Sequence, residues 1–144
     1  MRILIAEDEE ILGRVLKEEF EAEGYNVILV VNGSDVIKEL KKDGLKDIDL
    51  VLLDLLMPVV DGFQVLEELQ KNQALGSVSV IVLSNLGQDE EIKRAIKLGA
   101  MDYFVKSQHP ISEVVEKVKN FLEKPKTVSL KSESASKKKK SVKK

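Results

Sequence analysis

The residue with the most unusual setting in this sequence is Asp54, an acid inside a long apolar run. It follows Leu50-Val51-Leu52-Leu53 and precedes Leu55-Leu56-Met57. A carboxylate in apolar surroundings is costly unless it is paired with a cation, neutralised by a proton or bound to a metal. Asp54 is therefore a candidate for chemistry that needs a buried negative charge.

Four further polar groups follow other short apolar runs of the chain: Glu7, Asp8, Ser84 and Lys106. Each has an ordinary explanation when taken alone. Acids are favoured in the first turn of a helix, serine is common in turns, and lysine is usually on the surface. Together with Asp54 they make five polar groups at the ends of four runs, and this conjunction is what indicates a functional site.

The types of these residues suggest a reaction. Clustered carboxylates repel, and one would take up a proton unless a cation neutralised them. Mg²⁺ is the expected ion, because it binds a few carboxylates and keeps several waters. Carboxylate, Mg²⁺, lysine and hydroxyl together suit phosphoryl transfer, which depends on positioning and charge neutralisation. Aspartate is a known nucleophile in such reactions, so Asp54 is the predicted phosphoryl acceptor, with Ser84 and Lys106 beside it.

Elements that would bring these residues together are visible in the apolar pattern. Five short runs rich in branched residues predict buried strands, at 3–6, 27–31, 50–53, 78–83 and 103–105. Five amphipathic segments between and after them predict helices, at 11–20, 36–40, 63–69, 92–98 and 114–122, with Gly24, Gly44 and Gly99 near helix ends. This alternation predicts an α/β fold, a doubly wound five-stranded parallel sheet, whose ligands bind at the carboxyl ends of the strands.

Composition divides the chain into two parts. Residues 125–144 hold eight lysines and one glutamate and therefore carry a net charge of +7. Because the whole chain carries −2, the other 124 residues carry −9. The basic segment has few large apolar residues, which predicts a disordered Lys/Ser-rich tail after a domain at residues 1–124. The chain has no cysteine, no signal peptide pattern and no apolar run of membrane length. We therefore expect a soluble cytoplasmic protein.

Four motifs resemble those of the receiver domains of two-component response regulators. They are LIAEDEE (4–10), LVLLDLLMPVVDGFQVL (50–66), VIVLSNLGQ (80–88) and LGAMDYFVKS (98–107). The resemblance extends over roughly residues 2–123 and implies a flavodoxin-like fold with strand order 2-1-3-4-5. It also implies that a sensor histidine kinase or phosphotransfer protein donates a phosphoryl group to Asp54, with Mg²⁺ as cofactor.

The resemblance further implies a role for individual residues. Asp8 would bind Mg²⁺ directly, Glu7 largely through water, and Leu56 through its main-chain carbonyl, beside the Asp54 carboxylate. Ser84 would be the hydroxyl that turns toward the phosphoryl group, and Lys106 the lysine that pairs with it. Tyr103 would rotate inward as Ser84 moves, although plain core packing of Tyr103 is the alternative. Pro58, Asp61 and Gly62 would shape the loop that leads into the third helix.

Two departures from the family pattern stand out. Ser107 takes the place of a proline that usually follows the lysine in a cis peptide bond, which leaves the geometry of the 106–107 peptide open. Leu56 and Leu86 lie two residues beyond Asp54 and Ser84, where many relatives have polar side chains that orient the attacking water. A long-lived aspartyl phosphate is the expected consequence.

Competing functions are a Mg²⁺-dependent hydrolase of the haloacid dehalogenase type and a receiver-like binding module that is never phosphorylated. The hydrolase needs a second aspartate two residues after the first, where this chain has Leu56. The five polar site residues argue against the binding module. We therefore expect a signalling switch and not an enzyme in the usual sense, although it catalyses its own phosphoryl transfer and dephosphorylation.

Signal output is expected to leave the domain through a partner, because no output domain is recognisable after residue 124 and a stand-alone regulator is predicted. The responding surface would be formed by the fourth helix, the fifth strand and the fifth helix, which could also mediate a homodimer. The basic tail is either a solvated segment, a segment that folds back on the acidic body, or a weak contact to nucleic acid or an anionic membrane surface.

Overall fold

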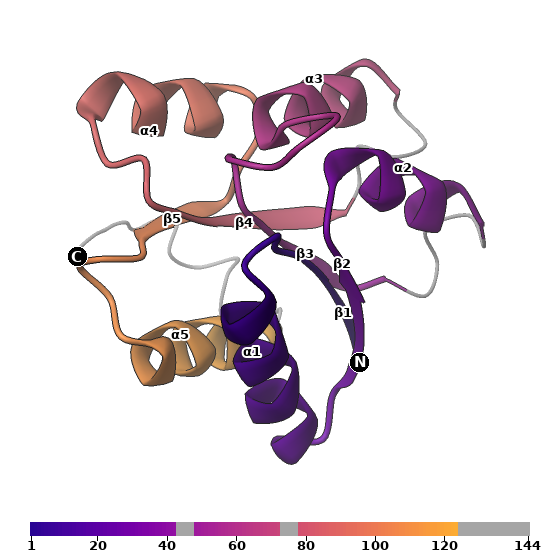
Figure 1. Cartoon of the computed structure of the whole chain (residues 1–144), viewed down its shortest axis with the longest axis vertical. Coiled ribbons are helices and arrows are strands. Elements are labelled where there is room, and N and C mark those ends of the chain that lie inside the picture. The colour runs from indigo at the N-terminus through magenta and orange to yellow at the C-terminus, as the bar shows by residue number, and fades with distance from the viewer. Residues whose placement is uncertain (43–47, 73–77, 124–144) are drawn as a thin grey trace, which may run out of the picture.

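The computed structural model describes residues 1–42, 48–72 and 78–123. Five strands and five helices alternate along this part of the chain (Figure 1). The strands are β1 (Arg2–Ala6), β2 (Asn26–Val30), β3 (Leu50–Leu53), β4 (Ser79–Ser84) and β5 (Asp102–Val105). The helices are α1 (Glu10–Ala22), α2 (Gly33–Lys42), α3 (Gly62–Lys71), α4 (Asp89–Lys97) and α5 (Ile111–Glu123).

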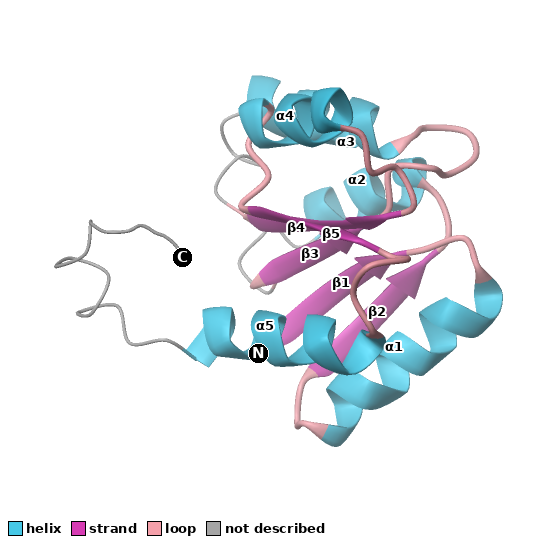
Figure 2. Cartoon of the chain, turned by 90° about the vertical axis from the view of Figure 1, so that its left-hand side faces the viewer, coloured by secondary structure: helices cyan, strands magenta, loops and turns pink. Residues whose placement is uncertain are grey.

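The strands form a single parallel sheet in the order β2-β1-β3-β4-β5. The order and the parallel pairing confirm the predicted doubly wound fold. Helices α1 and α5 cover one face of the sheet, and α2, α3 and α4 cover the other (Figure 2). From β1 the chain adds β2 on one side and then β3 on the other, so the strand order reverses between β1 and β3. Sheets of this class bind ligands at the carboxyl ends of the strands at that point.

Alternation along the strands divides the core into two layers. Ile3 and Ile5 of β1 pack on the α1–α5 side, whereas Leu4 and Ala6 pack on the side of α2, α3 and α4. Both sets are buried, because a central parallel strand has helices on both of its faces. This is why the predicted strands appeared as continuous apolar runs.

Helix boundaries differ from the predicted ones by a few residues, because caps and not apolar positions decide where helices begin. The Asp61 side chain accepts a hydrogen bond from the Gln64 amide, and the Gln64 side chain accepts one from the Asp61 amide, so α3 starts at Gly62. Gly24 and Gly99 have φ of 97° and 110°, as expected of residues that end helices. Gly44 and the predicted disordered tail lie outside the described residues.

Helix α4 is the least anchored of the five. Ala95 is its one buried residue. On the side of α3, Arg94 stacks 4.1 Å above the Phe63 ring and lies 3.3 Å from Glu67. In the described part of the chain no helix is both long enough and apolar enough to cross a lipid bilayer.

Candidate functional site

Main-chain hydrogen bonds fix three of the predicted site residues at the carboxyl edge of the sheet. The Glu7 amide donates to Val30 at 3.0 Å, and the Asp54 amide donates to Ala6 at 3.0 Å. The Lys106 amide donates to Ser84 at 2.9 Å, one residue beyond the end of β5. Each bond extends the ladder of a strand pair by one step, so the positions follow from the sheet register.

Lys106 is the centre of the site. Its ammonium nitrogen lies 3.1 Å from Asp54 Oδ2, 3.0 Å from Glu7 Oε2 and 2.7 Å from Glu9 Oε2. The Asp54 and Glu7 side chains are each 2% exposed, whereas the Glu9 side chain is 53% exposed. The buried acid that the sequence singled out is therefore paired with a lysine fifty-two residues away along the chain.

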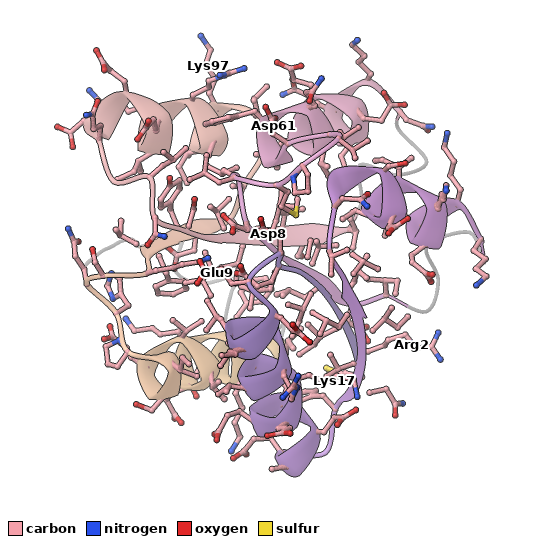
Figure 3. The ribbon with its side chains drawn as sticks, viewed as in Figure 1. Arg2, Asp8, Glu9, Lys17, Asp61 and Lys97 are labelled. Carbon is pink, nitrogen blue, oxygen red and sulfur yellow. The ribbon has the colours of Figure 1, made fainter. Side chains whose placement is uncertain are left out.

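Glu9 is the site residue that the sequence analysis missed. The carboxylates of Glu7, Glu9 and Asp54 have oxygens within 4.8 Å of one another, a group that could hold a metal ion. Asp8, the predicted direct ligand, is exposed and is not one of this group among the described residues. Figure 3 shows Asp8 and Glu9 next to each other just before α1.

The backbone before α1 explains why the side chain of Glu9, and not that of Asp8, lies beside Lys106. Residues 7–9 lie between β1 and α1 and belong to neither, and Glu9 has extended dihedral angles (φ −78°, ψ 109°). Successive side chains of an extended segment point to opposite sides. The side chains two apart, Glu7 and Glu9, reach the same lysine, and the Glu9 amide also donates to Glu7 Oε2 at 3.0 Å. The spacing of acids at positions 7 and 9 was the available signal.

Electrostatics at the site favour a further cation. Burial, and after it the charge of Asp54, raise the pKa of Glu7 to about 7, although the amide of Glu9 and the Lys106 ammonium oppose this rise. Burial alone would lower the pKa of Lys106, but hydrogen bonds to Glu9 and Glu7 and the charge of Asp54 outweigh it and raise that pKa. One lysine thus does not offset the buried negative charge, and oxygen ligands of this kind suit Mg²⁺.

The loop between β3 and α3 forms the other wall. Asp54 Oδ1 accepts a hydrogen bond from the Leu56 amide at 3.0 Å, so both carboxylate oxygens of Asp54 are held. The Leu56 side chain is 49% exposed and lines an open cavity of about 590 Å³ together with Asp8 and Leu86. Asp8 and Leu56 therefore face the same open cavity.

Comparison with known proteins identifies the family. A model of the response regulator receiver domain matches residues 3–119. The chain belongs to the response regulator receiver family. It is 32% identical over 120 residues to the response regulator SaeR of Staphylococcus aureus (strain USA300), an alignment that covers 83% of this chain and 50% of SaeR. The chain spans about half the length of the curated relatives it matches.

Solved receiver structures agree with this family. The receiver domain of the Francisella response regulator 1452 has a TM-score of 0.74 and 28% identity, covering 84% of this chain and 94% of that one. A phosphorylated cyanobacterial phytochrome response regulator, RcpA, has a TM-score of 0.75 and 26% identity, covering 85% and 94%. Two-component signalling is thus the setting of this receiver domain.

The predicted switch residues of the receiver meet at Leu86. Ser84 is fully buried, and its hydroxyl oxygen accepts a 3.4 Å hydrogen bond from the Leu86 amide. The Tyr103 hydroxyl donates to the Leu86 carbonyl at 2.5 Å. Burial, then the charges of Glu91 and Asp54, raise the pKa of Tyr103 to about 12, so it stays a donor at neutral pH. Ser84 and Tyr103 are thus connected through the main chain of one residue, Leu86.

The peptide bond between Lys106 and Ser107, where the family usually has a cis proline, is trans in this receiver. The described part of the chain contains no cis peptide bond, so the 106–107 peptide is trans. Lys106 nevertheless reaches Asp54, because the hydrogen bond from its own amide to Ser84 fixes its position.

Proposed function

We propose that this receiver domain accepts a phosphoryl group on Asp54 from a sensor histidine kinase or a phosphotransfer protein, with Mg²⁺ as its cofactor. The observation that carries the proposal is the Asp54 carboxylate, almost fully buried yet 3.1 Å from the Lys106 ammonium. The family adds support, since one similar receiver, RcpA, is described as phosphorylated.

Asp54 acts as the nucleophile. One of its carboxylate oxygens forms a bond to phosphorus while the bond from phosphorus to the donor's imidazole nitrogen breaks. Lys106 stabilises the charge on the phosphoryl oxygens, and Ser84 offers its hydroxyl to one of them. Positioning of the reactants and neutralisation of charge by such groups are the main source of catalysis in phosphoryl transfer.

The proposed Mg²⁺ ligands are the carboxylates of Asp8 and Asp54 and the carbonyl of Leu56, with the Glu7 carboxylate acting largely through water. The bound ion would neutralise negative charge on the carboxylates and on the phosphoryl oxygens. The raised pKa of Glu7, caused first by burial and then by Asp54, supports the need for such a charge. The open cavity lined by Asp8 and Leu56 leaves room for the waters that Mg²⁺ keeps.

Phosphorylation of Asp54 is tested with a small phosphodonor such as acetyl phosphate. Acid-stable, base-labile labelling of one site is expected, and it should require Mg²⁺. Asp54→Asn should abolish the labelling. Asp102→Asn, which alters an exposed acid at the first residue of β5, should leave it unchanged. Stoichiometric labelling of Asp54→Asn, or full labelling in EDTA, would contradict the proposal.

The receiver is proposed to be a signalling switch and not an enzyme that turns over a separate substrate. The Leu86 linkage between Ser84 and Tyr103 gives a route from the phosphoryl group to the surface of α4, β5 and α5. Helix α4, with its one buried residue, is the element that can move at least cost. Partner binding or homodimer formation at this surface is the proposed output.

A nuclear magnetic resonance experiment tests the switch. Beryllofluoride with Mg²⁺ mimics the phosphoryl group and is expected to shift the signals of Ser84, Tyr103 and α4 together. A ligand biases a two-state element only through contacts that differ between the states. If shifts stay confined to the surroundings of Asp54, the switch is wrong and the phosphorylation proposal still stands.

A further inference from the structure

The ammonium group of Lys106 has no hydrogen-bond donor left over. A lysine ammonium has three N–H donors. Three carboxylate oxygens lie within hydrogen-bonding distance of it, one each from Glu9, Glu7 and Asp54, at 2.7, 3.0 and 3.1 Å. A phosphoryl oxygen can therefore take a place on Lys106 only if one of these carboxylates gives up its own.

The three carboxylates differ in what it costs to release them. As the phosphoryl group arrives and before it bonds to Asp54, Glu7 and Asp54 are carboxylates that are each 2% exposed, and an unpaired buried charge is strongly penalised. The Glu9 side chain is 53% exposed, so water can replace the lysine around its carboxylate. Glu9 also stands on the three-residue connection before α1, whereas Asp54 is held by a second hydrogen bond from Leu56.

From this geometry we infer that Glu9 is a placeholder: its carboxylate holds the third donor of Lys106 until a phosphoryl oxygen takes that place. Glu9 is thus a positioning residue, which acts through Lys106 and does not touch the reacting atoms. It keeps the ammonium pointed at Asp54 in the resting receiver and sets how readily the phosphoryl group displaces it. The inference rests on the proposed phosphorylation of Asp54 and adds a regulator of that same site.

The test compares Glu9→Gln with Glu10→Gln in the full chain. Both changes remove one negative charge at the start of α1. Glu10 pairs with Arg14 at 3.3 Å and is highly exposed, so it serves as the matched control. Beryllofluoride binding at saturating Mg²⁺ is measured by calorimetry, since its fluorines stand in for phosphoryl oxygens. Glu9→Gln should bind it about two- to fivefold more tightly than the unaltered chain, as expected for loss of a partly exposed ion pair.

Glu10→Gln should bind beryllofluoride as the unaltered chain does, and Glu9→Asp, which keeps the charge, should return the affinity toward the original value. Equal tightening in both glutamine variants would mean a general charge effect and would overturn the inference. So would unchanged or weaker binding by Glu9→Gln.

A second measurement does not depend on phosphorylation. The side-chain ammonium signal of Lys106, followed by nuclear magnetic resonance without Mg²⁺, should shift and exchange faster with water in Glu9→Gln and stay unchanged in Glu10→Gln. An unmoved Lys106 signal in Glu9→Gln would overturn the placeholder alone. Failure of the unaltered chain to bind beryllofluoride would instead overturn the proposed function and the placeholder with it.

Discussion

Glu7 lies against Lys106 and is almost fully buried, yet its pKa is raised to about 7 from a usual 4.5 by burial first and by the charge of Asp54 second. An acid whose pKa is raised in the folded state holds its proton more tightly there than in the unfolded chain. Its contribution to stability is full below pH 4.5 and is lost as the pH rises through 7.

A decline of stability with pH is therefore expected in EDTA. The free energy of unfolding should fall between about pH 4.5 and 7, by at most about 3 kcal/mol, since each pKa unit corresponds to about 1.4 kcal/mol. Denaturant titrations across this range measure it. Glu7→Gln cannot ionise there and should lack this part of the decline, and Mg²⁺ should restore stability at pH 8 in the unaltered chain only. Parallel curves for the two proteins would contradict the assignment to Glu7.

Two leucines bear on the lifetime of the phosphoryl group. Leu56 and Leu86 both line the open cavity formed by the loop that follows Asp54, and neither side chain can hydrogen-bond an attacking water. The aspartyl phosphate should therefore be long-lived. Leu56→Asn and Leu86→Glu should each speed its decay by about two- to tenfold, the effect of one net hydrogen bond. Decay of the radiolabel measures this, with Leu56→Met and Leu86→Met as apolar controls; equal or slower decay in both polar variants would remove the argument.

At the scale of elements, α2 and the loop before α3 fit together without spare room. The Gly33 amide donates to the Val60 carbonyl at 3.0 Å, and a Cβ on Gly33 would lie 2.2 Å from that oxygen. The same loop includes Val59, whose φ of 69° is unusual for a β-branched residue. The loop that offers the Leu56 carbonyl is thus held in place by the start of α2.

The substitution Gly33→Ala distinguishes the effect of this contact on stability from the effect of helix propensity, because the two predict changes of opposite sign. Alanine in a helix is normally about 1 kcal/mol more stable than glycine, so propensity alone predicts a gain. The clash with Val60 predicts a loss of about 1–3 kcal/mol instead, measured by denaturant unfolding, with chemical-shift changes at Val60 and Leu56. Gly24→Ala, which meets no atom within 4 Å but has φ of 97°, should lose stability without those shifts. A more stable Gly33→Ala would show that the loop yields.

At the scale of the whole molecule, side-chain contacts bind the end of α5 to the turn after α1. The Tyr25 hydroxyl donates to Glu123 at 2.6 Å, and Lys119 lies 2.8 Å from Glu23, so the turn after α1 holds the last residues of α5. Among the described residues, contacts to the rest of the domain thus extend to the last residue of α5, Glu123.

A chain that ends at Glu123 should fold and be phosphorylated normally. The full chain alone should bind DNA weakly, with an affinity that falls steeply as salt rises, because the eight lysines of residues 125–144 would act through counterion release. Fluorescence anisotropy with labelled DNA at several salt concentrations compares the two. Indistinguishable binding at low salt would rule this out. A change in the rate of Asp54 phosphorylation without DNA binding would instead favour contact between the tail and the acidic domain.

The sequence alone was sufficient to predict the type and the succession along the chain of the strands and helices that the structure describes. Strands buried on both faces appear as continuous apolar runs, and the spacing of apolar residues marks the covered faces of the helices. It also predicted that Asp54, Ser84 and Lys106 share one edge, because the carboxyl ends of parallel strands lie there. The tail and the roles of the site residues stay predictions.

Only the tertiary structure decided which acids meet at Lys106. From the sequence, Glu7 and its neighbour Asp8 were the expected pair, but on the three-residue connection before α1 it is Glu7 and Glu9 that reach the same lysine, and Asp8 is exposed. The contacts of Lys106 with Glu7 and Glu9 cross 99 and 97 residues of chain. Local pattern fixes the period of each element, but the direction of a side chain on a connection depends on where the surrounding elements place its partner.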